Sequence, residues 1–198
     1  MGRIAGVTVE ETKRRLLDAA AAEFDRRGFE GTRVADIAAG AELSNGALYR
    51  HFASKSELLS AALTDRGSRE LEALFCGADG RSVADLLAAI GRTLDRIPPG
   101  RGGLMAEALV AARRDREVAQ VSSRHLAEVE KWLAGLIRDG QAEGAVDPGV
   151  ESAALARFCV MLVLGAVLLS PADLPGVPAS GWAALIERVA GAVAAPGK

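Results

Sequence analysis

The chain has 198 residues, of which 49% are apolar and 25% are charged, and its formal net charge at pH 7 is −2. This length suits one large domain, or one core with a small second module. The 39 alanines and 24 leucines favour helices, and the aromatic share of 4% argues against β-sandwiches and barrels. The composition also excludes disordered and collagen-like chains, and the near-neutral charge provides no global attraction for polyanions.

The compartment is predicted from the cysteines and the apolar segments. Cys76 and Cys159 are too few for a disulfide framework, which favours a reducing, intracellular setting. No apolar stretch of the signal-peptide type occurs near the N-terminus, so we expect a cytoplasmic protein. The most apolar run, residues 158–169, is shorter than the roughly 20 residues of a transmembrane helix. We expect it to be a buried helix and expect no membrane partner.

The N-terminal part begins with a predicted helix over about residues 9–27. Thr8 and Glu11 have the spacing of a capping box at its start, and Gly28 ends it. Phe29 follows as an expected core residue. One face of this helix is apolar at helical spacing and is formed by Leu16, Leu17, Ala20, Ala21 and Phe24.

Two short predicted helices follow, joined by only three residues. The first covers about residues 33–40 with Thr32 as its N-cap, and the second covers about 45–52 with Ser44 as its N-cap. This is the geometry of a helix-turn-helix. Its expected small core consists of Ile37, Ala38, Leu43, Leu48 and Phe52.

The remaining chain is also predicted to be helical. A longer helix begins after Ser54, which forms a second capping box with Glu57, and reaches about Phe75. The further predicted helices are residues 82–96, 102–113, 115–140, 150–170 and 181–194. Since no strand-like alternation of any length appears, the predicted fold class is all-α.

The other face of the second short helix is polar with small gaps, which suits a helix that enters a major groove about 12 Å wide. This face consists of Asn45, Gly46, Ala47, Tyr49, Arg50 and His51. Tyr49 alone would more often be a packing residue, and His51 alone a surface or half-buried histidine. Leu48 and Phe52 are core residues whatever the function.

The segment from Thr32 to Leu59 contains T-x-x-x-x-I-A, S-x-G-x-L-Y-x-H-F and S-K-x-x-L-L. This arrangement resembles the DNA-binding domain of TetR-family transcriptional repressors, over about Val9 to Leu63. The resemblance implies a three-helix DNA-binding domain with a helix-turn-helix over residues 1–54, and a helical ligand-binding and dimerisation domain over 55–198. One departure is Glu42, because the family usually places glycine in the turn.

The resemblance also implies roles for single residues. Tyr49, His51 and Lys55 match positions that grip the DNA backbone, and Asn45, Ala47 and Arg50 match positions that face base edges. Gly46 would let the helix start lie close to the DNA, while Arg3 and Lys13 are weaker candidates for backbone contact. The predicted DNA-binding residues are Thr32, Arg33, Ser44, Asn45, Gly46, Ala47, Tyr49, Arg50, His51 and Lys55.

The C-terminal part is expected to serve dimerisation and ligand sensing. A helix-turn-helix usually needs two copies to reach successive major grooves, and the last two helices are the expected homodimer interface. Trp182 and the stripe that follows it support this, although an intramolecular core is the alternative. The resemblance implies a pocket for a small, apolar effector, with candidate lining residues Met105, Leu109, His125, Trp132, Phe158, Met161 and Leu162. Plain core packing is the alternative for each of them.

Enzyme functions find no support in the sequence. It contains none of the motifs H-E-x-x-H, G-x-S-x-G, P-loop or G-x-G-x-x-G after a strand, and we expect no cofactor. Two histidines and two distant cysteines offer little for a metal site. The favoured hypothesis is a ligand-released repressor that binds a palindromic, double-stranded DNA operator as a homodimer. The rival is a helical binding or scaffold protein that has lost operator recognition.

Overall fold

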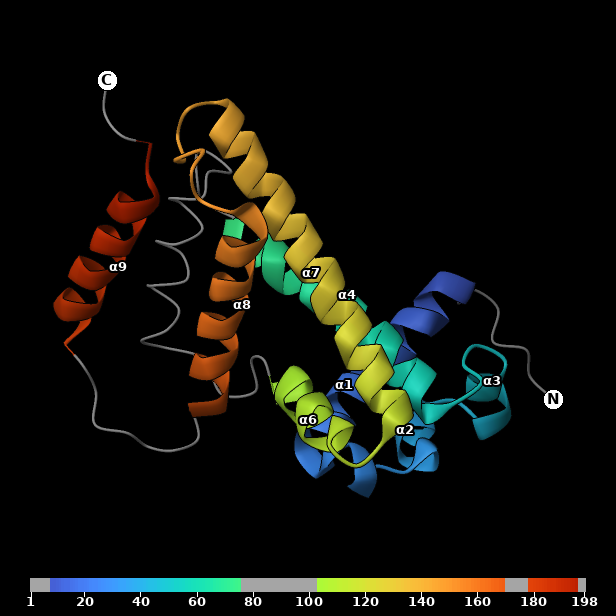
Figure 1. The fold of residues 1–198 in the computed structure, drawn as a ribbon. Coiled ribbons are helices and arrows are strands. Elements are labelled where there is room, and N and C mark those ends of the chain that lie inside the picture. Colours follow the sequence, from blue (N-terminus) through green and yellow to red (C-terminus); the bar gives the residue numbers. More distant parts are fainter. Residues whose placement is uncertain (1–7, 76–102, 170–177, 196–198) are drawn as a thin grey trace. The chain divides into compact units, whose positions relative to one another are not determined.

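A computed structural model describes residues 8–75, 103–169 and 178–195 (Figure 1). These residues form α1 (Val9–Gly31), α2 (Val34–Gly40), α3 (Asn45–Tyr49), α4 (Lys55–Phe75), α6 (Gly103–Ala112), α7 (Arg116–Ala142), α8 (Ser152–Leu169) and α9 (Ala179–Val193). The all-α prediction is confirmed. The helix predicted at 82–96, together with Cys76 and Arg3, lies outside the described residues.

The chain divides into two compact units. The first contains residues 1–68 and 103–125, and the second contains residues 69–102 and 126–198. The first unit therefore contains α6 and the start of α7 in addition to the helix-turn-helix. The functional boundary predicted at residue 54 stays a prediction.

The first unit is organised around α1, which packs against α2 and α6. Thr8 caps α1 by accepting a hydrogen bond from the Glu11 amide (3.1 Å), as predicted. Gly28 interrupts the helix with a φ of 71°, in the left-handed region that glycine tolerates. Phe29 then enters the core and is 5% exposed. The predicted apolar face of α1 is buried at Leu16, Leu17, Ala20, Ala21 and Phe24.

The start of α4 is fixed by the predicted capping box. The Ser54 hydroxyl accepts from the Glu57 amide (3.0 Å), and a Glu57 carboxylate oxygen accepts from the Ala53 amide (2.6 Å). Residues Leu58, Leu59, Ala62 and Leu63 then join the same core as α1 and α2. The start of α4 is therefore held at a fixed place directly after the helix-turn-helix.

The second unit has its own core, made by α7, α8 and α9. Ile186 is buried there, and Trp182 and Val193 pack against the same cluster. These three residues of the α9 stripe thus pack within the unit's own core, which is the alternative to a dimer interface, and the dimer interface stays a prediction. Leu185 lies outside that core cluster, and half of its surface is exposed.

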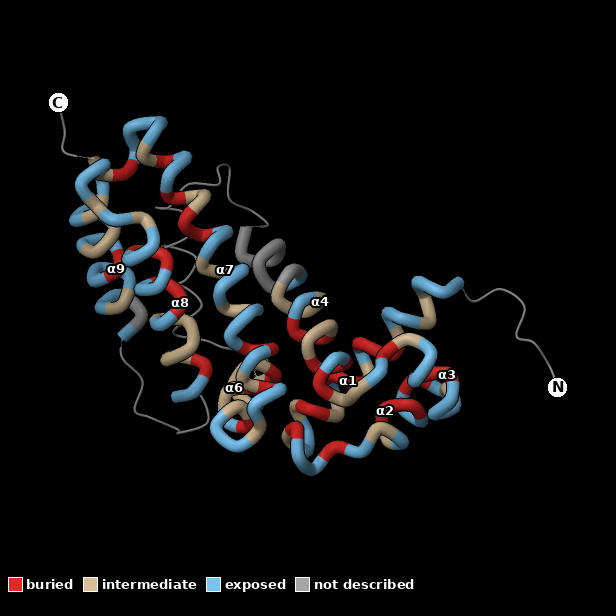
Figure 2. Tube along the Cα trace, turned by 45° about the vertical axis from the view of Figure 1, so that its right-hand side comes forward, coloured by how far each residue is buried: buried red, intermediate tan, exposed pale blue. Residues whose placement is uncertain are grey.

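Among the described helices, α8 alone has the length and hydropathy that crossing a membrane would require. It buries only one face, formed by Leu155, Ala156, Cys159, Val160 and Val167. Pale blue, exposed stretches alternate with these buried residues along α8 in Figure 2. Within the single chain the helix predicted to be buried over 158–169 is buried on one side only, since Phe158 and Met161 are exposed. The exposed side belongs to a helix that was also predicted to join the dimer interface.

Candidate nucleic-acid interface

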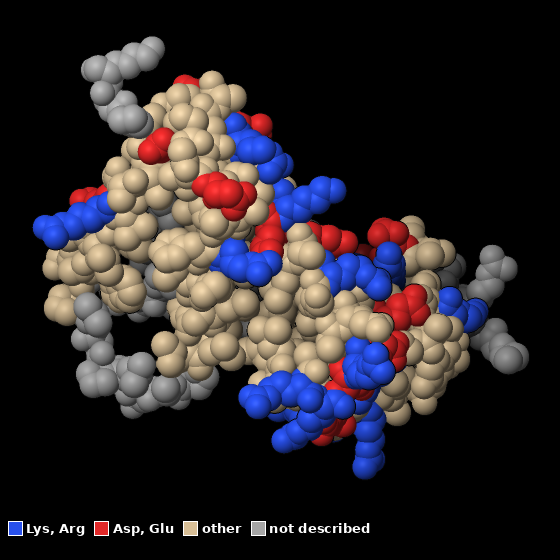
Figure 3. Space-filling model, viewed as in Figure 1, with Lys and Arg blue, Asp and Glu red and all other residues tan. Residues whose placement is uncertain are grey.

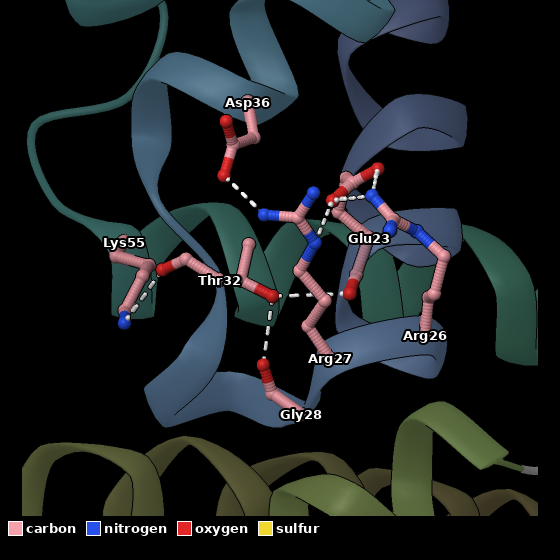
Figure 4. A network of polar contacts seen from close by, with 7 residues as sticks. All are labelled: Glu23, Arg26, Arg27, Gly28, Thr32, Asp36 and Lys55. Atoms are coloured by element: carbon pink, nitrogen blue, oxygen red, sulfur yellow. Dashed lines mark hydrogen bonds and ion pairs between the residues drawn. The ribbon is translucent and has the colours of Figure 1, made fainter.

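The start of α2 differs from the prediction. Arg33, not Thr32, is the N-cap residue, and no side chain caps the helix. Thr32 is 2% exposed, and its hydroxyl donates to the Gly28 carbonyl oxygen (2.7 Å) and lies 3.0 Å from the Glu23 carbonyl oxygen. Its hydroxyl thus closes the end of α1 (Figure 4). The cap role is wrong, and Thr32 offers no side chain to DNA in this conformation.

The turn between α2 and α3 accommodates Glu42 without losing its hydrogen bonds. Glu42 has a φ of 57°. Its amide donates to the Ala39 carbonyl oxygen (2.9 Å), and the Leu43 amide donates to Ala38 (2.8 Å). A Glu42 carboxylate oxygen accepts from Arg15 on α1 (2.7 Å). The turn therefore has the left-handed geometry that the family's glycine would give.

The third helix presents a polar side to its surroundings. Ser44 caps it by accepting from the Ala47 amide (3.2 Å), as predicted, and the helix ends at Tyr49, earlier than the predicted residue 52. Leu48 and Phe52 are buried at 1% and 4% exposure, while Tyr49 is 54% exposed. Ser44, Asn45, Gly46 and Arg50 are also exposed, and His51 is half-buried.

Ala47 does not lie on the exposed side of α3. It is 7% exposed, so its burial disfavours the predicted contact with a thymine methyl group, which stays a prediction. Its neighbour Gly46 has the opposite property. A Cβ atom added at Gly46 would meet nothing closer than the Ser44 hydroxyl oxygen, at 4.0 Å. The fold therefore leaves room for a side chain that the sequence does not supply.

Lys55 points toward the protein (Figure 4). Its ammonium donates to the carbonyl oxygens of Phe29 (2.7 Å) and Thr32 (3.2 Å). It also lies 4.3 Å from the centre of the Phe29 ring, within cation–π range. Burial lowers the pKa of Lys55 from its ordinary value, although nearby Asp115 opposes this. The side chain expected to grip DNA phosphate instead joins the start of α4 to the segment between α1 and α2.

The arginines near α2 fall into two groups. Arg26 pairs with Glu23 (2.6 Å), and Arg27 bridges Glu23 (3.3 Å) and Asp36 (2.7 Å), as Figure 4 shows. By contrast, Arg33 and Arg50 are exposed and belong to none of the ion pairs within the described ranges. The two arginines predicted to bind DNA, Arg33 and Arg50, are thus outside the described ion pairs, whereas Arg26 and Arg27 are paired.

The candidate effector residues are distributed over both units. Met105, Leu109 and His125 belong to the first unit and are half-buried. The His125 ring would lie 3.0 Å from a Cβ atom at Gly67, so this glycine allows α7 to approach α4 closely. In the second unit, Trp132, Phe158 and Met161 are 40%, 40% and 63% exposed, whereas Leu162 packs against the core. Exposed side chains do not line an enclosed pocket within that unit.

Comparisons with known proteins agree with this architecture. The family model described as bacterial regulatory proteins, tetR family, matches residues 16–62, which span most of α1, α2, α3 and the start of α4. The HTH-type transcriptional regulator UidR of Escherichia coli K12 is 26% identical over 156 residues, covering 79% of this chain and 80% of the relative. The HTH-type transcriptional repressor KstR2 of Mycobacterium tuberculosis is 48% identical over 63 residues, about a third of each chain.

The fold is shared with solved structures over nearly the whole chain. A TetR-family transcriptional regulator from Rhodococcus sp. superposes with a TM-score of 0.80, covering 93% of this chain and 99% of the other at 22% identity. Thus the helix-turn-helix resembles this family in sequence, and the complete chain resembles it in fold. Residues 16–62 match the TetR family of bacterial regulatory proteins, and the chain is similar to TetR-family transcriptional regulators over most of its length.

Proposed function

We propose that this protein is a cytoplasmic repressor that binds a palindromic operator as a homodimer and is released by a small, apolar ligand. The observation that supports DNA recognition most directly is the division of the helix-turn-helix into two sides. Leu48 and Phe52 anchor it in the core, while Asn45, Tyr49 and Arg50 are exposed. The anchored side fixes the orientation of the other, as a docked recognition helix requires.

Each exposed side chain suits a distinct DNA contact. Arg50 can donate two hydrogen bonds to guanine O6 and N7, and Asn45 can pair with adenine N6 and N7. Tyr49 carries a hydroxyl donor for a phosphate oxygen, which sets the register without reading sequence. The lack of a side chain at Gly46 would let the start of α3 approach the groove closely.

The free face of α8 supports dimerisation. Phe158, Met161, Leu168 and Leu169 are between 40% and 63% exposed and recur at helical spacing along one face. Leu185 adds an exposed apolar side chain on α9. A twofold interface must be self-complementary and is usually apolar, so this face fits a second copy of the chain.

The proposed effector is a small, apolar molecule. A ligand can release the protein from DNA only if it binds one conformation better than another. The family resemblance suggests the middle helices, and Met105 and Leu109 are half-buried in the first unit. Isothermal titration calorimetry with apolar candidate compounds tests this part. A compound that releases the protein from DNA should lower its affinity for DNA, and bound DNA should lower its affinity for the compound by the same factor.

The experiment that tests DNA binding starts from selection of operators out of random duplexes by the full-length protein. Affinity for the selected duplex should fall steeply as salt rises. Tyr49→Ala should weaken binding to every duplex. Arg50→Ala should cost about 1–3 kcal/mol at one base pair and relax specificity there. A protein that selects no duplex, even at low salt, would instead be the helical scaffold of the rival hypothesis.

A further inference from the structure

The connection between α6 and α7 carries three arginines that have no role in the site above. Arg113, Arg114 and Arg116 are exposed, and no ion pair between described residues involves any of them. Figure 3 shows Lys and Arg side chains gathered along the lower edge of the first unit, where α6 and the start of α7 lie in Figure 1. These guanidiniums are therefore available to an anionic partner.

Two acidic residues in the same stretch are already occupied. A carboxylate oxygen of Asp115 accepts hydrogen bonds from the amides of Glu117 (2.8 Å) and Val118 (3.1 Å), which caps the start of α7. A carboxylate oxygen of Glu117 accepts from the Ser54 hydroxyl (3.2 Å). Both acids thus hold helix starts in place, whereas the neighbouring arginines extend from the surface.

The same contacts place this connection beside the helix-turn-helix. Ser54 precedes α4 and follows Phe52 by only two residues, so its bond to Glu117 brings the start of α7 to the end of that motif. Val118 and Val121 are buried in the core that also contains Leu48 and Phe52. The arginines and α3 therefore belong to one packed unit.

We propose that Arg113, Arg114 and Arg116 form a second DNA-contacting patch, which binds phosphate groups of the duplex backbone beside the groove that α3 enters. This rests on the proposed function, and it adds contacts outside the helix-turn-helix. The planar guanidinium donates paired hydrogen bonds to phosphate oxygens, which makes arginine well suited to this partner. Phosphate contacts carry no sequence information, so the patch strengthens binding to operator and non-operator duplexes alike.

The test compares two triple variants of the full-length protein. Arg113→Gln/Arg114→Gln/Arg116→Gln removes the patch. Arg124→Gln/Lys131→Gln/Arg138→Gln removes the same number of exposed charges farther along α7. Affinity for a selected operator duplex and for an unrelated duplex of equal length is measured at several salt concentrations. Thermal unfolding of both variants checks that the fold is intact.

The patch variant should bind both duplexes about tenfold or more weakly at 0.1 M salt. Its plot of log K against log salt should be shallower by about 0.9 for each lost phosphate contact, hence by about two or more for a dimer. The control variant should keep the wild-type slope. A patch variant with wild-type slope and affinity would overturn the inference and leave the proposed function standing, and would point to an acidic protein as the partner. A loss confined to the operator would also overturn it. Failure of the wild-type protein to bind any duplex would instead refute the proposed function.

Discussion

Glu42 shows how one residue can meet a backbone requirement for which it is poorly suited. A side chain in the left-handed region costs about 1–2 kcal/mol relative to the right-handed one, and glycine avoids this. The Arg15–Glu42 pair offsets little of the strain, because the Glu42 side chain is 83% exposed and exposed pairs contribute about 0–1 kcal/mol. The turn is kept by the surrounding hydrogen bonds and by Leu43, which packs against the core.

Glu42→Gly should therefore raise the free energy of unfolding by about 0.5–1 kcal/mol. Glu42→Ala keeps the strained backbone and loses the pair with Arg15, so it should be slightly less stable than the wild type. Urea unfolding followed by circular dichroism measures both changes. If the Glu42→Gly variant is less stable than the wild type, the turn is not strained and Glu42 stabilises it.

A substitution at Gly46 should affect the stability of the fold and the affinity for DNA differently. Gly46→Ala should leave the fold intact or stabilise it by up to about 1 kcal/mol, because alanine is the better helix former and the nearest atom lies 4.0 Å away. The same variant should bind operator DNA at least about tenfold more weakly, since the added methyl group meets the duplex. Thermal unfolding and gel shifts on one preparation reveal both effects. Unchanged DNA affinity would mean that α3 does not approach the duplex at this residue.

Lys55 should influence DNA binding indirectly, because its hydrogen bonds hold the segment between α1 and α2. Lys55→Met removes two hydrogen bonds from a charged donor, so it should lower stability by about 1–2 kcal/mol and weaken DNA binding without changing the salt dependence. Arg33→Gln is the matched control: Arg33 is exposed and belongs to no ion pair of the described residues. It should keep stability and reduce the salt slope by about 0.9 per contact. If Lys55→Met keeps the wild-type stability and its plot of log K against log salt becomes shallower, Lys55 binds a DNA phosphate after all.

The outcomes at Ser44, Thr32, Ala47 and Lys55 show which site properties a sequence can predict. The Ser44 cap depends on atoms three residues apart, and the pattern predicted it correctly. Thr32 instead finds its acceptors on α1, and Lys55 finds its acceptors at Phe29 and Thr32. These partners are set by how α1, α2 and α4 pack, which the local pattern does not contain. Ala47 is small enough to suit either side of α3, so its burial was not predictable.

At the scale of the helix, the spacing of apolar residues predicted that each described helix exists. It predicted less well which face of each helix is buried. The apolar run in α8 was expected to form a buried helix, and the helix that contains it was expected to join the dimer interface. The structure gives it two apolar sides, one against the core of its unit and one exposed. A uniformly apolar helix carries no periodic signal that separates a core face from an interface.

The buried side of α8 makes a testable chemical difference. Burial raises the pKa of the Cys159 thiol to about 11, so almost no thiolate is present at pH 8. In a Cys76→Ser variant, the remaining thiol should react with a disulfide reagent at least about a hundredfold more slowly in the native protein than in urea. The linked stability is complete below about pH 9 and is lost as the pH rises toward 11, because the unfolded thiol ionises first. Rapid native labelling at pH 8 would show that this face of α8 is open.

At the scale of the whole molecule, the exposed side of α8 links assembly to DNA binding. One helix-turn-helix reaches one major groove, and two successive grooves on one side of a duplex are about 34 Å apart. A palindromic site therefore needs a dimer that holds its two copies of α3 at this spacing. In the proposed dimer, the exposed side of α8 and Leu185 of α9 would provide the apolar surface in the second unit, separate in sequence from the residues that would touch DNA.

Met161→Glu tests this link because Met161 is 63% exposed and the change should leave the single chain folded. In a twofold dimer, two carboxylates would be buried without partners, which costs about 3 kcal/mol or more of dimer stability. The dissociation constant of the dimer should therefore rise by at least about a hundredfold. Sedimentation equilibrium measures the dimer, and gel shifts compare a palindromic duplex with a single half-site. Palindrome affinity should fall while half-site affinity holds. Gln120→Glu introduces the same charge at an exposed position of the first unit and should dimerise normally. A Met161→Glu protein that remains a tight dimer would place the interface on another surface.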